Sequence, residues 1–158
     1  MSITKEITCQ DKKSAICNLI LRELPTWFGI ESSIIEYVEA VRNMPFYATY
    51  VENTPIGFVA IKPHNIYTAE IYVMGILSEY HRQGIGKTLV EQCDIFCKKN
   101  NMEYLTVKTL DESAKSNSYE KTRKFYLAAG FRPLEVFPLH WDKSNPCLFL
   151  AKKIDIIK

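Results

Sequence analysis

The stretch from Ile71 to Lys87 reads IYVMGILSEYHRQGIGK, and it decides how the rest of the chain is interpreted. Its first half is an apolar run rich in β-branched and aromatic residues, which is typical of a buried strand. A short polar turn follows. Gly84 and Gly86 then stand one residue apart, before an amphipathic segment that indicates a helix. The stretch therefore predicts a strand, a glycine-containing turn and a helix in direct succession.

This turn has the chemistry of an anion-binding site. Gly84 and Gly86 carry no Cβ, so a ligand can approach the main chain closely. The first N–H groups of a helix have no partner within the helix, and they lie at the positive end of its dipole. Hydrogen bonds to charged groups contribute roughly 1.5–3 kcal/mol each. Arg82 and Lys87 add positive charge on either side, and we therefore expect the turn to bind phosphate groups.

The spacing of the glycines separates the known kinds of phosphate-binding turn. A nucleotide-hydrolase P-loop would place its first glycine where this chain has His81. A dinucleotide-binding fingerprint would place its third glycine where this chain has Leu89. The sequence therefore favours neither of these two families.

The segment His81–Gly86 resembles the cofactor-binding motif of the GNAT superfamily of acyl-CoA-dependent N-acyltransferases. That motif reads [QR]-x-x-G-x-[GA] and follows a strand, as here. His81 stands where Gln or Arg is usual, with Arg82 beside it. The resemblance implies acetyl-CoA as the acyl-donor cosubstrate and a reaction that uses no metal.

A second motif lies further along the chain, where residues 119–131 read YEKTRKFYLAAGF. It resembles the later GNAT signature, in which a helix carries a tyrosine that is followed four residues on by Gly-Phe. The common form has Asn and Ala where this chain has Tyr119 and Thr122, so this is the Tyr-x-x-Thr-Arg-x-Phe-Tyr variant. Gly130 is a suitable residue to end the helix. The two motifs occur in the expected order, with one helix and one strand between them.

Length and composition are those of an ordinary globular protein. With 158 residues we expect one N-acetyltransferase domain over residues 1–158. A net charge of +2 gives no reason to expect nucleic acid or a membrane as partner. Five irregularly spaced cysteines argue against a secreted disulfide framework, and Cys93 and Cys97 are expected to pack in the core. The N-terminus lacks the apolar core of a signal peptide, so a cytoplasmic protein is expected.

Periodicity predicts the order of the secondary-structure elements. Strands are expected at 3–9, 46–51, 56–61, 68–77, 103–110, 132–137 and 147–152, and helices at 13–24, 32–42, 85–99 and before Gly130. Ser32 or Ser33 would cap the second helix, and His140–Pro146 would be a loop. This order predicts an α/β (α+β) fold with a mixed sheet and helices on both faces. The resemblance implies a GNAT-like sheet that is largely antiparallel and splayed beside Met74.

Acetyl transfer to an amine needs a proton acceptor and a proton donor. An amine with a pKa of about 10.4 is almost fully protonated at neutral pH, so less than about one molecule in a thousand can attack. The resemblance implies Tyr126 as the general acid for the departing thiolate and Glu70 as the general base. The alternatives are that Tyr126 only packs against the cofactor arm and that Glu70 only forms a salt bridge. His64, His81 and His140 are ranked lower, as solvated residues.

The resemblance also assigns the cofactor contacts. It implies that the Met74 amide faces the thioester oxygen and that Gly75 and Ile76 contact the pantetheine arm. The other expected cofactor-binding residues are those of the turn and of the later helix, namely Arg82, Gln83, Gly84, Ile85, Gly86, Lys87, Tyr119 and Arg123.

The expected function is transfer of the acetyl group to a primary amine of a small molecule, by direct attack in a ternary complex. The alternatives are a peptide or protein acetyltransferase acting on N-termini or lysines, and a catalytically inactive acyl-CoA-binding module. A monomer and a homodimer are both compatible with the sequence. The acceptor pocket is expected among aromatic and acidic residues, namely Trp27, Phe28, Tyr37 and Trp141, with Glu31, Glu36 or Asp142.

Overall fold

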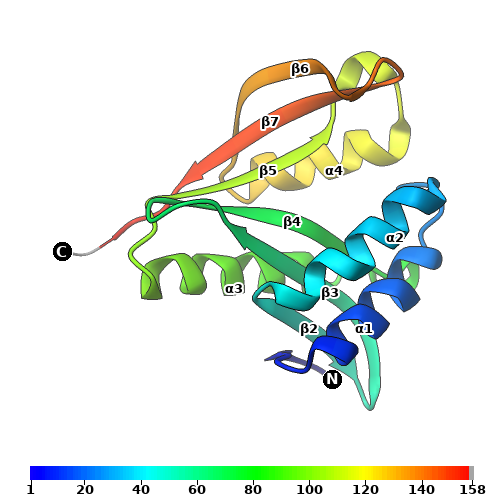
Figure 1. Cartoon of the computed structure of the whole chain (residues 1–158), viewed down its shortest axis with the longest axis vertical. Helices are drawn as coiled ribbons and strands as arrows, with labels where there is room; N and C mark the ends of the chain where they lie inside the picture. The colour runs from blue at the N-terminus through cyan, green and yellow to red at the C-terminus, as the bar shows by residue number, and fades with distance from the viewer. Residues whose placement is uncertain (157–158) are drawn as a thin grey trace. The chain divides into compact units, whose positions relative to one another are not determined.

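The computed structural model describes residues 1–156 of the chain, whose helices and strands follow the predicted order (Figure 1). The strands are β1 (Ser2–Glu6), β2 (Phe46–Val51), β3 (Thr54–Pro63), β4 (Thr68–Ile76), β5 (Tyr104–Leu110), β6 (Arg132–Asp142) and β7 (Asn145–Lys153). The helices are α1 (Gln10–Arg22), α2 (Glu31–Ala40), α3 (Ile85–Lys99) and α4 (Asn117–Ala128), with short 3-10 turns between some elements.

The strands form one mixed sheet in the order β1-β2-β3-β4-β5-β7-β6. The pairs β1–β2, β2–β3, β5–β7 and β6–β7 are antiparallel, whereas β4 and β5 are parallel. This confirms the predicted α/β fold with a mixed, largely antiparallel sheet.

The chain divides into two compact units. The first consists of Met1–Lys62 and Tyr72–Cys93, and the second of Pro63–Ile71 and the residues from Asp94 onward. The boundary falls inside β4, so this strand contributes its first half to the second unit and its second half to the first. The expectation of a single N-acetyltransferase domain stays a prediction.

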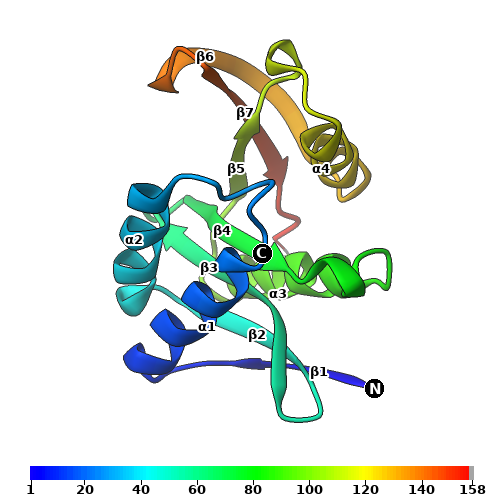
Figure 2. The same ribbon diagram turned by 90° about the vertical axis from the view of Figure 1, so that its right-hand side faces the viewer.

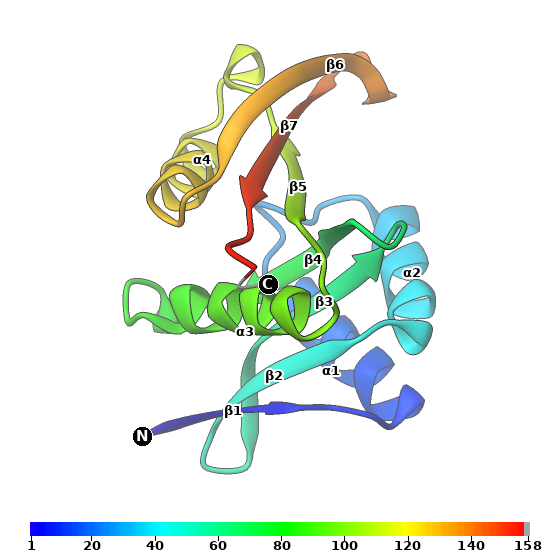
Figure 3. The same cartoon turned by 90° about the vertical axis from the view of Figure 1, so that its left-hand side faces the viewer.

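In the first unit, helices lie on both faces of the strands (Figures 2 and 3). Phe46 of β2 and Phe58 of β3 are fully buried, and their rings stack with centroids 5.2 Å apart in the core that α1 and α2 cover. Successive strand residues point to opposite faces. Gly57, next to Phe58, accordingly faces α3, where an added Cβ would lie 3.4 Å from Cγ2 of Ile85. The predicted two-sided arrangement is thus confirmed for this unit.

In the second unit, β6 is an edge strand of eleven residues. It exposes the large apolar side chains of Leu134, Val136, Leu139 and Trp141. The prediction of a loop at His140–Pro146 is wrong, because β6 continues to Asp142 and β7 starts at Asn145. The Asp142 carboxylate accepts hydrogen bonds from the Ser144 amide at 2.8 Å and from the Asn145 side chain at 3.0 Å, which closes the tight turn.

The five cysteines differ sharply in exposure. Cys9 is exposed, whereas Cys17, Cys93, Cys97 and Cys147 are buried, as core packing predicts for Cys93 and Cys97. Burial raises the pKa of the Cys17 thiol to about 12 and that of the Cys147 thiol to about 11. These groups remain protonated thiols well above neutral pH, and only the thiolate is reactive.

We therefore expect an aromatic disulfide reagent to modify one thiol per native chain, and five per chain after denaturation. Raising the pH from 7 to 9 should accelerate the reaction of Cys9 without adding a second fast thiol. The measurement is the absorbance of the released thiolate, and Cys9→Ser should abolish the fast phase. Any fast thiol in native Cys9→Ser would contradict the burial of the other four.

Among residues 1–156, no helix combines the length and the apolar character that crossing a membrane requires.

Candidate active site

The predicted phosphate-binding turn lies in the first unit, between a 3-10 turn at Ser78–Tyr80 and the start of α3. Its main chain enters the left-handed region twice, at Arg82 with a φ of 62° and at Gly84 with a φ of 80°. A Cβ added to Gly84 would meet no atom within 4 Å, so the space above this residue is open. Left-handed residues in a turn expose successive N–H groups as an anion-binding concavity. The residues present therefore fit the diphosphate of coenzyme A.

The start of α3 is fixed by hydrogen bonds to this turn. The Gly84 carbonyl accepts bonds from the amide and the hydroxyl of Thr88, both at 3.1 Å. The Gln83 side chain donates to the Glu79 carbonyl at 3.1 Å, which fixes the preceding segment. Ile85 is buried, whereas Arg82 and Lys87 are exposed. The expected cofactor contacts of Gln83 and Ile85 would thus come from the main chain, and those of Arg82 and Lys87 from charged side chains.

His81, which departs from the family motif, connects the turn to the end of β4. Its Nε2 lies 2.7 Å from the Ile76 carbonyl oxygen, which can only accept, so Nε2 donates. The His81 ring also packs edge-on against Trp27, with centroids 5.6 Å apart. His81 therefore fixes the position of the main chain at Ile76, one of the residues expected to contact the pantetheine arm.

Gly75 has a packing reason to be glycine that the sequence did not reveal. An added Cβ would lie 3.2 Å from Ile20, and 3.3 Å from both Leu24 and Phe58. Such contacts are tighter than most core contacts, so any larger residue would disturb the packing of α1 on the strands. The glycine is therefore explained by the core rather than by a close ligand. The contact of its main chain with the cofactor stays a prediction.

Met74 lies beyond the segment of β4 that pairs with β5. The parallel register runs from Thr68 opposite Tyr104 to Ile71 opposite Val107, three residues before Met74. The expected role of the Met74 amide, at the thioester oxygen, requires a main-chain group outside the paired segment. The contact of the Met74 amide with the thioester stays a prediction.

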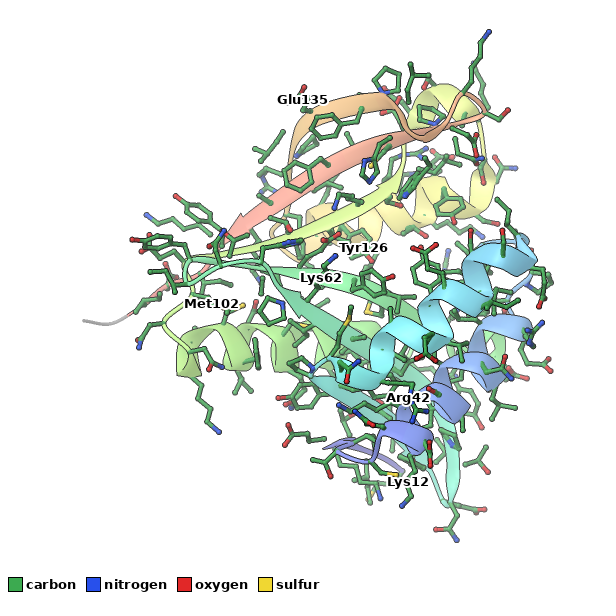
Figure 4. The ribbon with its side chains drawn as sticks, viewed as in Figure 1. Lys12, Arg42, Lys62, Met102, Tyr126 and Glu135 are labelled. Atoms are coloured by element: carbon green, nitrogen blue, oxygen red, sulfur yellow. The ribbon has the colours of Figure 1, made fainter. Side chains whose placement is uncertain are left out.

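Tyr126 lies on α4 in the second unit and is 6% exposed (Figure 4). Its ring packs edge-on against Phe131, with centroids 5.4 Å apart. The end of α4 forms a Schellman motif, in which the Phe131 amide donates to the Tyr126 carbonyl at 3.0 Å and the Gly130 amide to the Leu127 carbonyl at 3.1 Å. Gly130 has a φ of 101°, which confirms its predicted role in ending the helix. This motif fixes both the main chain and the ring of Tyr126.

Replacing Gly130 by alanine should lower the free energy of unfolding by about 1–3 kcal/mol, because a Cβ is unfavourable at this φ. The measurement is urea-induced unfolding followed by circular dichroism. Gly130→Asn is the matched control. Asparagine tolerates the left-handed region better than alanine, so the free energy of unfolding should fall less in this variant. Equal stability of the wild type and Gly130→Ala would show that the backbone conformation at this position costs nothing.

The other two predicted residues of α4 have defined surroundings. Burial raises the pKa of Tyr119 to about 12, so its phenol is uncharged at neutral pH. Arg123 donates from Nη1 to the Leu110 carbonyl at the end of β5, at 2.8 Å. A guanidinium has five N–H donors, so this bond leaves others for the expected cofactor contact.

The buried Glu70 side chain contacts two more exposed side chains that sequence reasoning had not joined to it. Its Oε2 accepts a hydrogen bond from Nζ of Lys108 at 3.0 Å, and its Oε1 lies 2.6 Å from Nε2 of His64. The Glu70 side chain is 7% exposed. Register could have indicated Lys108: Glu70 pairs with Thr106, and Lys108 lies two residues further along β5 on the same face. His64 is exposed, as expected of a solvated residue, but its contact with Glu70 was not foreseen.

Beside this cluster, a cavity of about 410 Å³ opens in the second unit. Its lining combines polar and cationic groups with two aromatic rings, from His64, Asn65, Thr68, Thr106, Lys108, Phe137, His140 and Phe149. Trp27, Phe28, Tyr37 and Trp141, the aromatic residues expected to line the acceptor pocket, do not line this cavity. Phe28 and Tyr37 instead pack edge-on against each other in the first unit, with centroids 6.0 Å apart.

Comparison with known proteins gives the same family as the two motifs. The family model for the acetyltransferase (GNAT) domain matches residues 42–133, which is more than half of the chain. An uncharacterized N-acetyltransferase of Chlorobaculum tepidum is 26% identical over 98 residues, which cover 61% of this chain and 62% of that protein. The match thus spans less than two thirds of the relative's length.

Two solved structures illustrate the shared fold. An aminoglycoside 6'-N-acetyltransferase in complex with coenzyme A has a TM-score of 0.75 at 20% identity, over 99% of both chains. The ribosomal-protein-S18-alanine N-acetyltransferase of Escherichia coli has a TM-score of 0.79 at 13% identity, over 100% of this chain and 97% of that one. With the family-model match, the motifs and the fold, the chain belongs to the GNAT acetyltransferase family.

Proposed function

We propose that this protein transfers the acetyl group of acetyl-CoA to a primary amine of a small molecule, by direct attack in a ternary complex. The observation that carries the proposal is the left-handed turn at Gly84, with open space above it at the start of α3. Main-chain N–H groups in such a turn can bind an anion. Coenzyme A carries such an anion in its diphosphate. The aminoglycoside acetyltransferase of the same fold binds coenzyme A.

The roles we assign follow from the chemistry of each group. Bound acetyl-CoA supplies an activated acetyl thioester. The Met74 amide donates a hydrogen bond to the carbonyl oxygen of that thioester, where negative charge develops. An amide in such a place contributes about 2.7–4 kcal/mol of transition-state stabilisation. Tyr126 donates a proton to the departing sulfur, and the cluster around Glu70 takes up the proton of the amine.

The cavity beside Glu70 supports a small acceptor. Its volume of about 410 Å³ lies in the range typical of small-molecule sites. Phe137 and Phe149 offer apolar surface to the body of a ligand, whereas the threonines and Asn65 offer hydrogen bonds. The lining residues include no Asp or Glu, and Lys108 balances the charge of Glu70 behind them. These features favour an amine with an apolar body and disfavour one with several positive charges.

A protein substrate is the second candidate. The Escherichia coli enzyme of the same fold acts on an alanine of ribosomal protein S18. In that case the same cavity would receive only the terminal residue of a peptide.

Two measurements test the proposal in sequence. Titration calorimetry with acetyl-CoA should show saturable binding, and a panel of small amines and short peptides should then give acetylated products by mass spectrometry. Binding without any product would favour a non-enzymatic acyl-CoA-binding module, and products from peptides alone would favour the second candidate. No binding at millimolar acetyl-CoA would rule out the proposal.

A further inference from the structure

We infer that His64 is the group that takes the proton from the acceptor amine, and that Glu70 is a positioning residue that orients the His64 imidazole. This inference rests on the proposed function. It assigns the proton transfer within the Glu70 cluster to an atom that neither the family motifs nor the spacing of residues in the sequence indicates.

Glu70 is poorly placed to meet a substrate directly. Both of its carboxylate oxygens already have donors, His64 at Oε1 and Lys108 at Oε2, and its side chain is only 7% exposed. Glu70 is also absent from the residues that line the cavity, whereas both of its partners line it. A ligand in the cavity therefore meets His64 and Lys108 first, with Glu70 behind them.

The partners of Glu70 determine which nitrogen of His64 carries the hydrogen. The Glu70 carboxylate forms an ion pair with Lys108, and the oxygens of a carboxylate in an ion pair accept hydrogen bonds. Nε2 of His64, 2.6 Å from Oε1, must therefore be the N–H donor. In an uncharged imidazole the other nitrogen then has the lone pair. Within residues 1–156, Nδ1 of His64 has no hydrogen-bond partner, so it is available to a ligand.

The surroundings of His64 suit a group that gains and then loses a proton. Glu70 lies beside the His64 ring, and Lys108 contacts the other oxygen of the same carboxylate. His140 is the other titratable group of the cavity lining, and the Cys147 thiol near the cluster is uncharged because burial raises its pKa to about 11. The His64 side chain is 36% exposed, so the proton can pass on to solvent. The His64 amide donates to the Thr68 carbonyl at 2.9 Å, which fixes its main chain.

The acceptor nitrogen loses two protons in the proposed step. The acceptor ammonium gives one proton to Nδ1 of His64 and becomes a neutral amine. The nitrogen lone pair then forms the N–C bond to the thioester carbon, and the C–S bond breaks. Tyr126 gives its phenol proton to the leaving sulfur. The second proton of the nitrogen then restores the Tyr126 phenol through solvent, so the products are an amide and a thiol. The proton on His64 passes to solvent, and one proton is released per turnover.

The first test needs no substrate. Long-range ¹H–¹⁵N spectra of the labelled full chain report which imidazole nitrogen carries the hydrogen. In the uncharged ring we expect His64 to have Nε2 protonated and Nδ1 bare, with its signals assigned by their loss in His64→Gln. Glu70→Gln should abolish this single tautomer, whereas Glu135→Gln, the same change at an exposed position on β6, should leave it intact. A protonated Nδ1 in the wild type would overturn the inference.

The second test uses an amine found by the product screen. His64→Gln keeps a donor toward Glu70 but has no basic nitrogen. We expect kcat/KM for the amine to fall by about 10²–10⁴ and the acidic limb of its pH profile to disappear. The Kd for acetyl-CoA should stay unchanged, since that is measured without amine. An acidic limb that survives in His64→Gln would return the role of base to Glu70. Absence of all turnover in the wild type would count against the proposed function, while the spectra would still decide the tautomer.

Discussion

Tyr126→Phe should lower kcat by about 10²–10⁴, while the Kd for acetyl-CoA stays nearly the same. The phenol oxygen is the only atom removed, so the packing of the ring against Phe131 is retained. A positioned proton donor contributes such a factor, which corresponds to roughly 3–5 kcal/mol of activation free energy. Steady-state kinetics and titration calorimetry measure the two quantities separately.

Tyr104→Phe is the matched control for this experiment. It removes the same atom from an exposed tyrosine on β5, and kcat should not change. If Tyr126→Phe also leaves kcat unchanged, Tyr126 only packs within its unit, and the proton of the sulfur comes from another source.

The second large effect is expected at the phosphate-binding turn. Gly84→Val should weaken acetyl-CoA binding by about 10- to 100-fold, because a branched side chain would occupy the open space above the turn and remove one or more charged hydrogen bonds. The left-handed φ of 80° adds a cost in folding of order 1–3 kcal/mol. Calorimetry gives the affinity, and urea unfolding gives the stability.

Gly130→Val separates strain from binding. Gly130 is also a glycine with a left-handed φ, of 101°, but it follows the end of α4 and does not belong to the phosphate-binding turn. This variant should lose stability to a similar degree and keep its affinity for acetyl-CoA. Equal losses of affinity in both variants would mean that destabilisation, rather than the blocked turn, weakens binding.

The order of elements was predictable from the sequence because most segments carry a clear period and a clear terminator. The strand–turn–helix at Gly84 and the end of α4 at Gly130 were predictable because both glycines adopt left-handed conformations that few other residues tolerate. The first and last residues of the elements were predicted less accurately than their order. The start of α2 was expected at a serine cap, but the helix begins at Glu31 with Ile30 before it and no capping side chain.

β6 was expected to end at residue 137, but it continues through Pro138 to Asp142. Proline is unfavourable in a central strand, where every N–H is needed, but an edge strand tolerates it. The position of a strand in the sheet depends on pairings between distant segments, and a local pattern does not contain them.

In the candidate site, too, local patterns were predictable and contacts between distant segments were not. Motifs indicated the expected phosphate-binding turn, Tyr126 and Glu70 as candidates, since each belongs to a local pattern. The partners of Glu70 come from a turn and from a neighbouring parallel strand, with Lys108 lying 38 residues away in the chain. The packing reason for Gly75 likewise depends on α1, which lies more than fifty residues earlier. Both become evident only when the register of the strands is known.

The edge strand β6 also bears on how copies of the protein can associate. Pro133 and Pro138 offer no N–H, and two irregularities interrupt the register of β6 with its neighbour. A strand from another molecule would therefore find no continuous row of main-chain donors to extend the sheet. This protects the protein against fibrillar growth from that edge, despite the exposed apolar side chains of β6.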